Sequence, residues 1–187
     1  ELIGGRQASI DLVAGPTSAE HRAQRLSRPA RPHAANEKEL AAHRELLARS
    51  GVAVSMSAGP GGIELAVAAD DQRGLLSLVA GTLAMHRLDV RSAGTLTEGR
   101  RALLVLTVES AFGAPVDLDR LTVDIRRALE GSLDLTAALR RREEAYGRPA
   151  PTFDRPANRA DLIAGAAAVA TVVEVRAHDR PGLLHQL

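Results

Sequence analysis

One stretch of this sequence occurs twice, and the two copies stand 108 residues apart. Each copy has an alternating apolar segment, then the pattern Asp-x-x-Gly-Leu-Leu, then the start of an apolar helix. The shared positions are Val67, Ala69, Asp71, Gly74, Leu75 and Leu76 in the first copy and Val175, Ala177, Asp179, Gly182, Leu183 and Leu184 in the second. This repeat predicts that the chain holds one copy of a domain and the start of another.

The turn between strand and helix gives the repeat its chemistry. Asp71 and Asp179 are placed to accept hydrogen bonds from the N–H groups at the helix start. Gly74 and Gly182 allow a close backbone approach, or a positive φ that costs other residues ~1–2 kcal/mol. Pro181 suits a first helical position, and the N–H groups form a small anion site suited to a carboxylate. The candidate ligand-binding residues are therefore those of the two turns: Asp71, Gln72, Arg73, Gly74, Leu75, Asp179, Arg180, Pro181, Gly182 and Leu183.

Each of these residues also has a purely structural interpretation. The glycines serve the turn itself, and the aspartates either cap helices or meet a ligand amine. Arg180 is either an exposed turn residue or a contact to a ligand carboxylate. The first copy has Gln72-Arg73 where the second has Arg180-Pro181, so the two copies need not bind a ligand equally.

The pattern around the first copy predicts an α+β domain of the ferredoxin-like type. Residues 63–131 change between strand and helix periodicity in the order β-α-β-β-α, which leaves a fourth strand to be supplied. The short strand candidate at 161–163 is predicted to supply it. Residues 52–69 have the pattern of a hairpin with one buried face. Asn36 and Glu39 have the capping-box spacing for a helix over 37–49.

These patterns divide the chain into five parts. They are a linker or poorly ordered lead-in at 1–35, a capped helix and hairpin strand at 36–61, a first domain at 62–132, a charged helix, Pro-rich connector and fourth strand at 133–169, and a truncated second domain at 170–187. The sequence begins without a methionine and ends inside an apolar helical pattern, so the chain is expected to be a fragment of a larger protein.

Composition removes several classes of function. The chain has 187 residues, no cysteine and 2% aromatic residues. It therefore has no disulfide, thiolate nucleophile or cysteine metal site, and little to stack on nucleic-acid bases. A net charge of +1 argues against specific nucleic-acid binding. No apolar run reaches the roughly 18 residues of a membrane span, so no membrane contact and a cytoplasmic location are expected.

The second copy, Val175-Arg176-Ala177-His178-Asp179-Arg180-Pro181-Gly182-Leu183-Leu184, resembles the opening of an ACT domain, a βαββαβ module that binds amino acids. The first copy, from Ala69 to Val90, fits the same family. Tandem ACT domains with a charged helical connector, and an Ala-Thr-Val-Val-Glu-Val-Arg-Ala lead-in at 170–177, resemble the C-terminal region of the bacterial bifunctional protein-PII uridylyltransferases/uridylyl-removing enzymes, in their actinobacterial form.

The resemblance implies a regulatory region that senses an amino acid, L-glutamine, and takes part in controlling nitrogen assimilation. The parent enzyme it implies transfers and removes a uridylyl or adenylyl group on the PII signal protein. Magnesium is expected for the parent enzyme, and no cofactor is expected for this region.

No catalytic or metal-binding residue is predicted in this chain. Gly4-Gly5 with Asp11 only faintly echoes a nucleotidyltransferase motif, because Ser9 stands where a magnesium-binding carboxylate is needed. His178-Asp179 shares only its letters with a hydrolytic HD site. Two other functions stay open. One is an ACT pair on another protein of amino-acid metabolism. The other is a structural module without a ligand, whose exposed strand edges pair two chains through their sheets.

Overall fold

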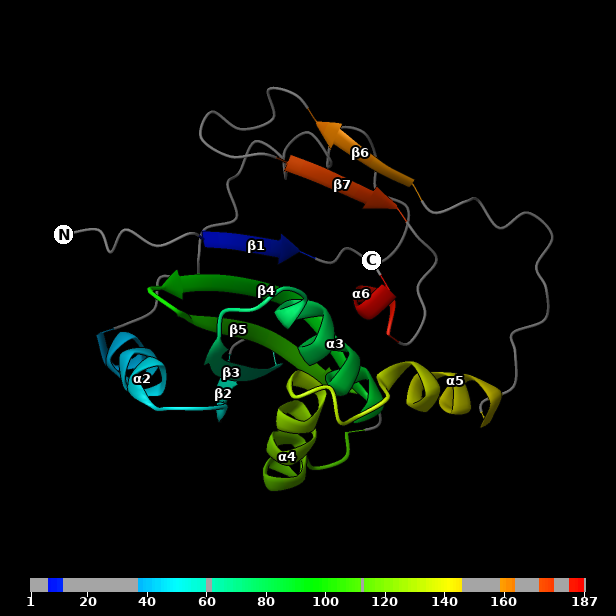
Figure 1. The fold of residues 1–187 in the computed structure, drawn as a ribbon, viewed down its shortest axis with the longest axis horizontal. Helices are drawn as coiled ribbons and strands as arrows, with labels where there is room; N and C mark the ends of the chain where they lie inside the picture. The colour runs from blue at the N-terminus through cyan, green and yellow to red at the C-terminus, as the bar shows by residue number, and fades with distance from the viewer. Residues whose placement is uncertain are drawn as a thin grey trace.

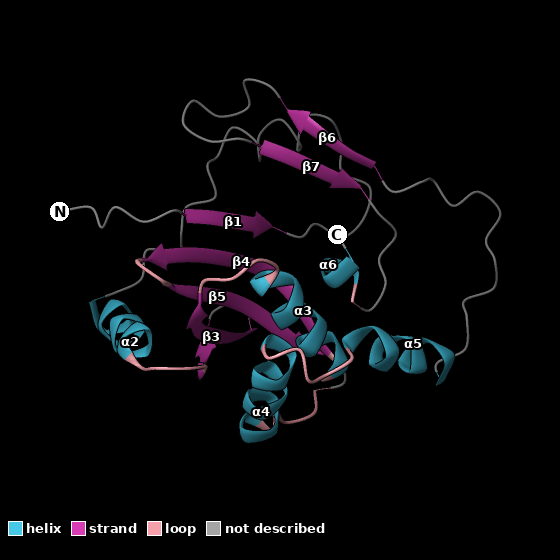
Figure 2. Cartoon of the chain, in the orientation of Figure 1, coloured by secondary structure: helices cyan, strands magenta, loops and turns pink. Residues whose placement is uncertain are grey.

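The computed structural model describes residues 7–11, 37–59, 62–111, 113–145, 159–163, 172–176 and 182–186 (Figures 1 and 2). Its main sheet has five strands in the order β1-β4-β5-β3-β2, and every neighbouring pair is antiparallel. The strands are β1 (Gln7–Asp11), β2 (Ala53–Gly59), β3 (Gly62–Asp70), β4 (Leu88–Glu98) and β5 (Arg101–Ser110).

Two helices cover one face of the main sheet, α3 (Leu75–Met85) and α4 (Leu118–Leu129). Alternate residues of β3 and β5 point toward them, because successive side chains of a strand face opposite sides. The side chains of this core are almost completely buried, and they include Leu65, Val67, Leu104, Leu106 and Val108 from the strands and Val79, Leu83, Leu121 and Ile125 from the helices.

A third helix, α2 (Glu37–Ala48), covers part of the opposite face. Leu46 and Leu47 of this helix form a second apolar cluster with Ala66 and Ala68 of β3 and Leu103 of β5. The central strands are therefore covered on both sides, which explains why both faces of β3 and β5 are apolar.

The order β3-α3-β4-β5-α4 confirms the predicted β-α-β-β-α succession. The hairpin is also confirmed, since Ala53 pairs with Ala68 and Gly59 with Gly62. Helix α2 confirms the predicted helix over 37–49 within one residue. Together β2 to β5 and the two covering helices form an α+β arrangement that is compatible with a ferredoxin-like domain.

The predicted fourth strand is wrong in its placement. Residues 161–163 do belong to a strand, β6 (Arg159–Ile163), but it pairs with β7 (Val172–Arg176) in a separate two-stranded sheet. The position beside β3 is filled by β2 instead. Because only two residues separate β2 from β3 in the chain, the two strands meet at a small entropic cost of loop closure. A strand some 90 residues further along has no such advantage.

The strand β1 was not foreseen within the lead-in at 1–35. It pairs along the outer edge of β4, from Gln7 opposite Leu96 to Asp11 opposite Ser92. The N–H and C=O groups of that edge of β4 are therefore paired along this stretch.

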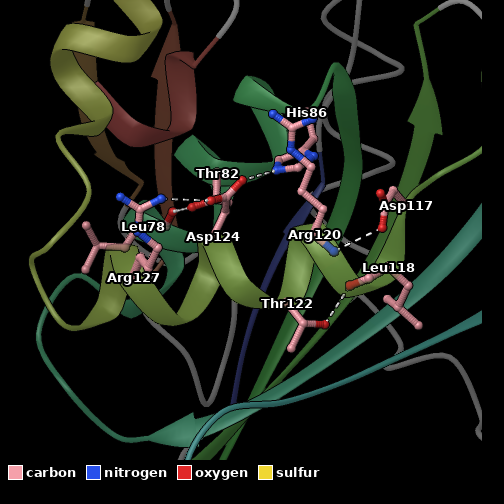
Figure 3. Close-up of polar contacts among 9 residues, drawn as sticks. All are labelled: Leu78, Thr82, His86, Asp117, Leu118, Arg120, Thr122, Asp124 and Arg127. Carbon is pink, nitrogen blue, oxygen red and sulfur yellow. Dashed lines mark hydrogen bonds and ion pairs between the residues drawn. The ribbon is translucent and has the colours of Figure 1, made fainter.

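A polar contact joins α3 to α4 across the covered face of the sheet (Figure 3). Nε2 of His86 lies 2.9 Å from Oδ2 of Asp124, and the two side chains are only 14% and 12% exposed. Arg127 stands 3.6 Å from the other carboxylate oxygen. The start of α4 is capped by Asp117, whose side chain accepts from the N–H of Arg120 at 3.0 Å.

Replacing Asp124 with alanine is expected to destabilise the fold by about 1–3 kcal/mol. The substitution leaves Nε2 of His86 little exposed and without its acceptor, and an unmade hydrogen bond costs the desolvation of that group. Urea unfolding measures the difference. Glu45→Ala is the matched control, because Glu45 pairs with Arg49 at 2.8 Å but both side chains are mostly exposed. That exposed pair should contribute only about 0.3–0.5 kcal/mol. Equal losses of unfolding free energy in the two variants would mean that the buried contact between His86 and Asp124 does not stabilise the fold more than an exposed ion pair.

Candidate functional site

The first repeated turn lies open at the start of α3. Asp71, Gln72, Arg73 and Gly74 are all exposed. Gly74 has φ of +80° and is the residue that begins the helix, and no described atom lies within 4 Å of a Cβ built there. Of the two reasons proposed for this glycine, the structure shows the positive φ and not a close backbone approach.

The prediction that Asp71 caps α3 is wrong. Helix α3 has no side-chain hydrogen bond at its cap position, which is Gly74. A capping side chain has to come from the cap residue itself to reach the N–H groups of the first turn. Asp71 lies three residues earlier, and its backbone N–H donates to the carbonyl of Arg100 at 2.8 Å. The first turn is thus tied to the β4–β5 turn, while the Asp71 side chain is at the surface.

Two further predicted residues attach this turn to the domain. Nε2 of Gln72 donates to the carbonyl of Leu129 at the end of α4, at 3.3 Å. Leu75 is only 5% exposed and belongs to the main core. The exposed polar groups that the turn offers to a ligand therefore come from residues 71–74.

In the second turn the structure describes Gly182 but not Asp179, Arg180 or Pro181, which lie outside the described residues. Gly182 has φ of +76°, close to that of Gly74. It precedes the short helix α6 (Leu183–Gln186), which begins with the predicted residue Leu183. The repeat in the sequence is thus also a repeat in backbone conformation.

The two glycines differ sharply in their surroundings. Gly182 is buried, and a Cβ built on it would lie 2.7 Å from Cδ1 of Leu139. Leu139 belongs to α5 (Leu135–Ala145) and is 3% exposed. The described part of the second turn is therefore covered by α5, and the first turn is open.

The hairpins that lead into the two turns also correspond. In the first copy β2 pairs antiparallel with β3, the strand that ends at the turn. In the second copy β6 pairs antiparallel with β7, which is the repeated strand. Each copy thus receives its neighbouring strand from the segment just before it in the chain.

A small open cavity of about 360 Å³ lies near the first turn, between the end of α2 and the β4–β5 turn. It is lined by Arg44, Leu47, Ala48, Glu98 and Arg101. Nη1 of Arg101 pairs with Oδ1 of Asp70 at 3.0 Å, which joins the cavity to the residue before Asp71. Nη2 of Arg101 is buried and has no hydrogen-bond partner within the described part of the chain.

Sequence reasoning missed this cavity. The cavity brings guanidinium groups and a carboxylate to one opening, which suits a small molecule that carries a positive and a negative charge. The only signal available was the pairing of Asp70 with Arg101 across the sheet, and that pairing depends on the strand order.

The described residues contain neither a cluster of metal-binding side chains nor a helix that could cross a membrane. No group of three histidine, cysteine, aspartate or glutamate side chains among them could hold a metal ion. Nor is any helix in this part of the chain both long and apolar enough to cross a membrane.

The chain is similar to several bifunctional uridylyltransferases/uridylyl-removing enzymes. It is 42% identical over 135 residues to one from Streptomyces coelicolor, a match that covers 68% of this chain and 16% of the relative. The match to one from Azospirillum brasilense has 35% identity over 131 residues, or 66% of this chain and 14% of the relative. One from Mycobacterium tuberculosis is 31% identical over 153 residues, or 74% and 19%.

The chain thus spans less than a fifth of the length of each of these relatives. No family model matches the chain, and no solved structure matches it. The resemblance that the repeated motif indicated is confirmed at the level of these enzymes.

Proposed function

We propose that this chain, a relative of the bifunctional uridylyltransferases/uridylyl-removing enzymes, is an amino-acid-sensing regulatory region of such an enzyme. In this proposal it consists of one ACT-type copy and the beginning of a second. The observation that carries the proposal is the repeated turn, in which a glycine with φ near +80° opens a helix in both copies. The similarity to these enzymes supports the choice of parent over another protein of amino-acid metabolism.

The proposed ligand is L-glutamine, and the proposed site is the first turn. The exposed groups of Asp71, Gln72 and Arg73 offer a carboxylate, an amide and a guanidinium there. A zwitterionic amino acid presents groups of opposite charge, which these side chains complement. The cavity beside Asp70 extends the same surface and offers further groups of both signs.

The proposed role is to bias the parent enzyme between transfer and removal of a nucleotidyl group, uridylyl or adenylyl, on the PII protein. Glutamine must bind the two states of the enzyme unequally for this. A coupling of about 1–3 kcal/mol corresponds to a 5- to 150-fold change in activity. Magnesium at the parent's catalytic site, pairing of two chains through their sheets and a cytoplasmic location remain predictions that accompany this proposal.

Titration of L-glutamine into the chain by calorimetry is expected to give saturable heat, whereas L-glutamate and L-isoleucine should give none. Gly74→Ala should weaken glutamine binding at least tenfold, since a Cβ at φ of +80° forces the turn to change its backbone. Gly113→Ala is the matched control. Gly113 has φ of +64°, also with no described atom within 4 Å of a Cβ. Alanine there should therefore introduce a comparable backbone strain at a position away from the first turn.

The proposal would be contradicted if glutamine gave no heat of binding with the chain and did not change the balance of activities in the parent enzyme. Equal weakening by Gly74→Ala and Gly113→Ala would instead contradict the placement of the ligand at the first turn. In the parent enzyme, glutamine should shift the balance between transfer and removal. The Gly74→Ala variant should need a higher glutamine concentration for the same shift.

A further inference from the structure

We infer that α3 of the first copy and α5, the helix that follows this copy, form a docking face for the helix of the second copy, so that the two copies behave as one unit within one chain. This docking face consists of Ser77, Gly81 and Leu139, and its occupant is the segment Gly182–Gln186. The inference goes beyond amino-acid sensing and does not depend on any ligand.

The polar part of the contact joins the same helix position in the two copies. Ser77 and His185 stand 108 residues apart, which is the spacing of the repeat. The Ser77 hydroxyl donates to the carbonyl of His185 at 2.9 Å. Nδ1 of His185 lies 3.0 Å from the carbonyl oxygen of Ser77. Since a carbonyl only accepts, this second bond places the proton on Nδ1.

The shape of the docking face depends on a glycine. A Cβ built on Gly81 would lie 2.8 Å from Cγ of His185 and 3.2 Å from its Cβ. A side chain at position 81 therefore forces the ring of His185 to turn aside, and the Cβ of His185, which is fixed to the backbone of α6, must shift by a few tenths of an ångström. Glycine is also a poor residue for a helix interior, and Gly81 lies in the middle of α3. The need to leave room for the imidazole ring of His185 gives a physical reason for a glycine at position 81.

The third residue of the docking face, Leu139, contacts the glycine that precedes α6. Leu139 of α5 packs against Gly182, with three of its side-chain carbons within 3.5 Å of where a Cβ would be. Helix α5 also packs against α3, as the arrangement in Figure 1 shows. The start of the second copy is therefore held between two helices that come from or follow the first copy.

The occupant is the second copy of the same chain and not a second chain. The residue at the repeated position is histidine in one copy and serine in the other, so the contact joins two different side chains. Two first copies from separate chains would place serine against serine and would leave the space above Gly81 unfilled.

Hydrogen exchange in the full 187-residue chain tests this inference. Gly81→Ala is expected to raise the exchange rate of the amides in 182–186 at least tenfold. Exchange in β3 and β5 should not rise, because alanine is the better residue for α3 itself. His185→Ala should also speed exchange in 182–186, through loss of the imidazole ring and of the hydrogen bond that its Nδ1 donates to the Ser77 carbonyl. Combining both substitutions should give slower exchange than the two single effects predict, since the new methyl group occupies space that the ring has left.

Gly94→Ala is the matched control. Gly94 lies in β4, and only the Val105 carbonyl, at 4.0 Å, comes near a Cβ built there. It should leave exchange in 182–186 unchanged. Unchanged exchange there in Gly81→Ala, or strictly additive effects in the double variant, would overturn the inference. A dependence of that exchange on protein concentration would also overturn it, because the occupant would then come from another chain.

Discussion

Leu106→Ala is expected to lower the free energy of unfolding by about 2–5 kcal/mol, the largest effect of any single truncation proposed for this chain. Leu106 is fully buried in β5 and belongs to the core between the main sheet and the two helices α3 and α4. Strand β5 is flanked by β4 and β3. Both neighbours hold its backbone in place, so the cavity left by the side chain cannot collapse easily. Urea unfolding followed by circular dichroism measures the loss.

Val123→Ala provides the comparison for this truncation. Val123 lies on α4 and is 47% exposed, so its removal creates no cavity. Alanine is also the better helix residue, and the change should stay within about 0.5 kcal/mol of the original stability. A loss below 1 kcal/mol for Leu106→Ala, or a similar loss for both variants, would mean that the core is not packed as described.

The elements that the sequence predicted well are those whose own residues decide their structure. Strand β5 appears as an apolar run from Ala102 to Val108 that only Thr107 interrupts, and the structure covers both of its faces, with α2 on one side. Helix α4 has an amphipathic stripe and a capping aspartate at Asp117. In each case the local sequence pattern agrees with the environment in the folded domain, so the pattern alone is enough to predict the element.

The elements that were missed depend on partners far away in the sequence. Nothing in residues 7–11 specifies that β4 rather than another edge will accept them. Residues 161–163 are predicted as a strand, but nothing in them distinguishes β3 from β7 as the partner. A strand's periodicity fixes which side chains face the core, whereas the pairing partner follows from chain connection and from which edges remain open.

The candidate site shows the same division. The positive φ of Gly74 and Gly182 could be inferred, because the repeated glycine stands where a strand turns into a helix. The burial of Gly182 could not be inferred, because the helix predicted after residue 132 is charged, and a charged helix gives no sign of a buried contact. The available signal was the pair Leu135 and Leu139, one helical turn apart and both 3% exposed in the structure. Such a short stripe predicts a buried contact without naming the partner.

Gly62→Ala is expected to destabilise the chain by about 1–3 kcal/mol from backbone strain alone, and by more once the new methyl group is accommodated. Gly62 has φ of +129°, a region that is essentially restricted to glycine, and a Cβ built there would lie 2.8 Å from the carbonyl oxygen of Val108. That oxygen belongs to the backbone of β5, next to β3 in the sheet. It cannot move aside as a flexible side chain would. Urea unfolding measures the loss.

Gly59→Ala separates this cause from a general effect of changing the hairpin. Gly59 pairs with Gly62 across the hairpin. Its φ is not in the positive region, and a Cβ there would meet its nearest neighbour at an ordinary 3.5 Å. The change should therefore cost less than about 1 kcal/mol, within the range of ordinary surface substitutions or slightly above it. If Gly59→Ala and Gly62→Ala proved equally costly, the close approach of β3 to the Val108 carbonyl would not be what requires glycine at position 62. The turn composition alone would then explain both residues.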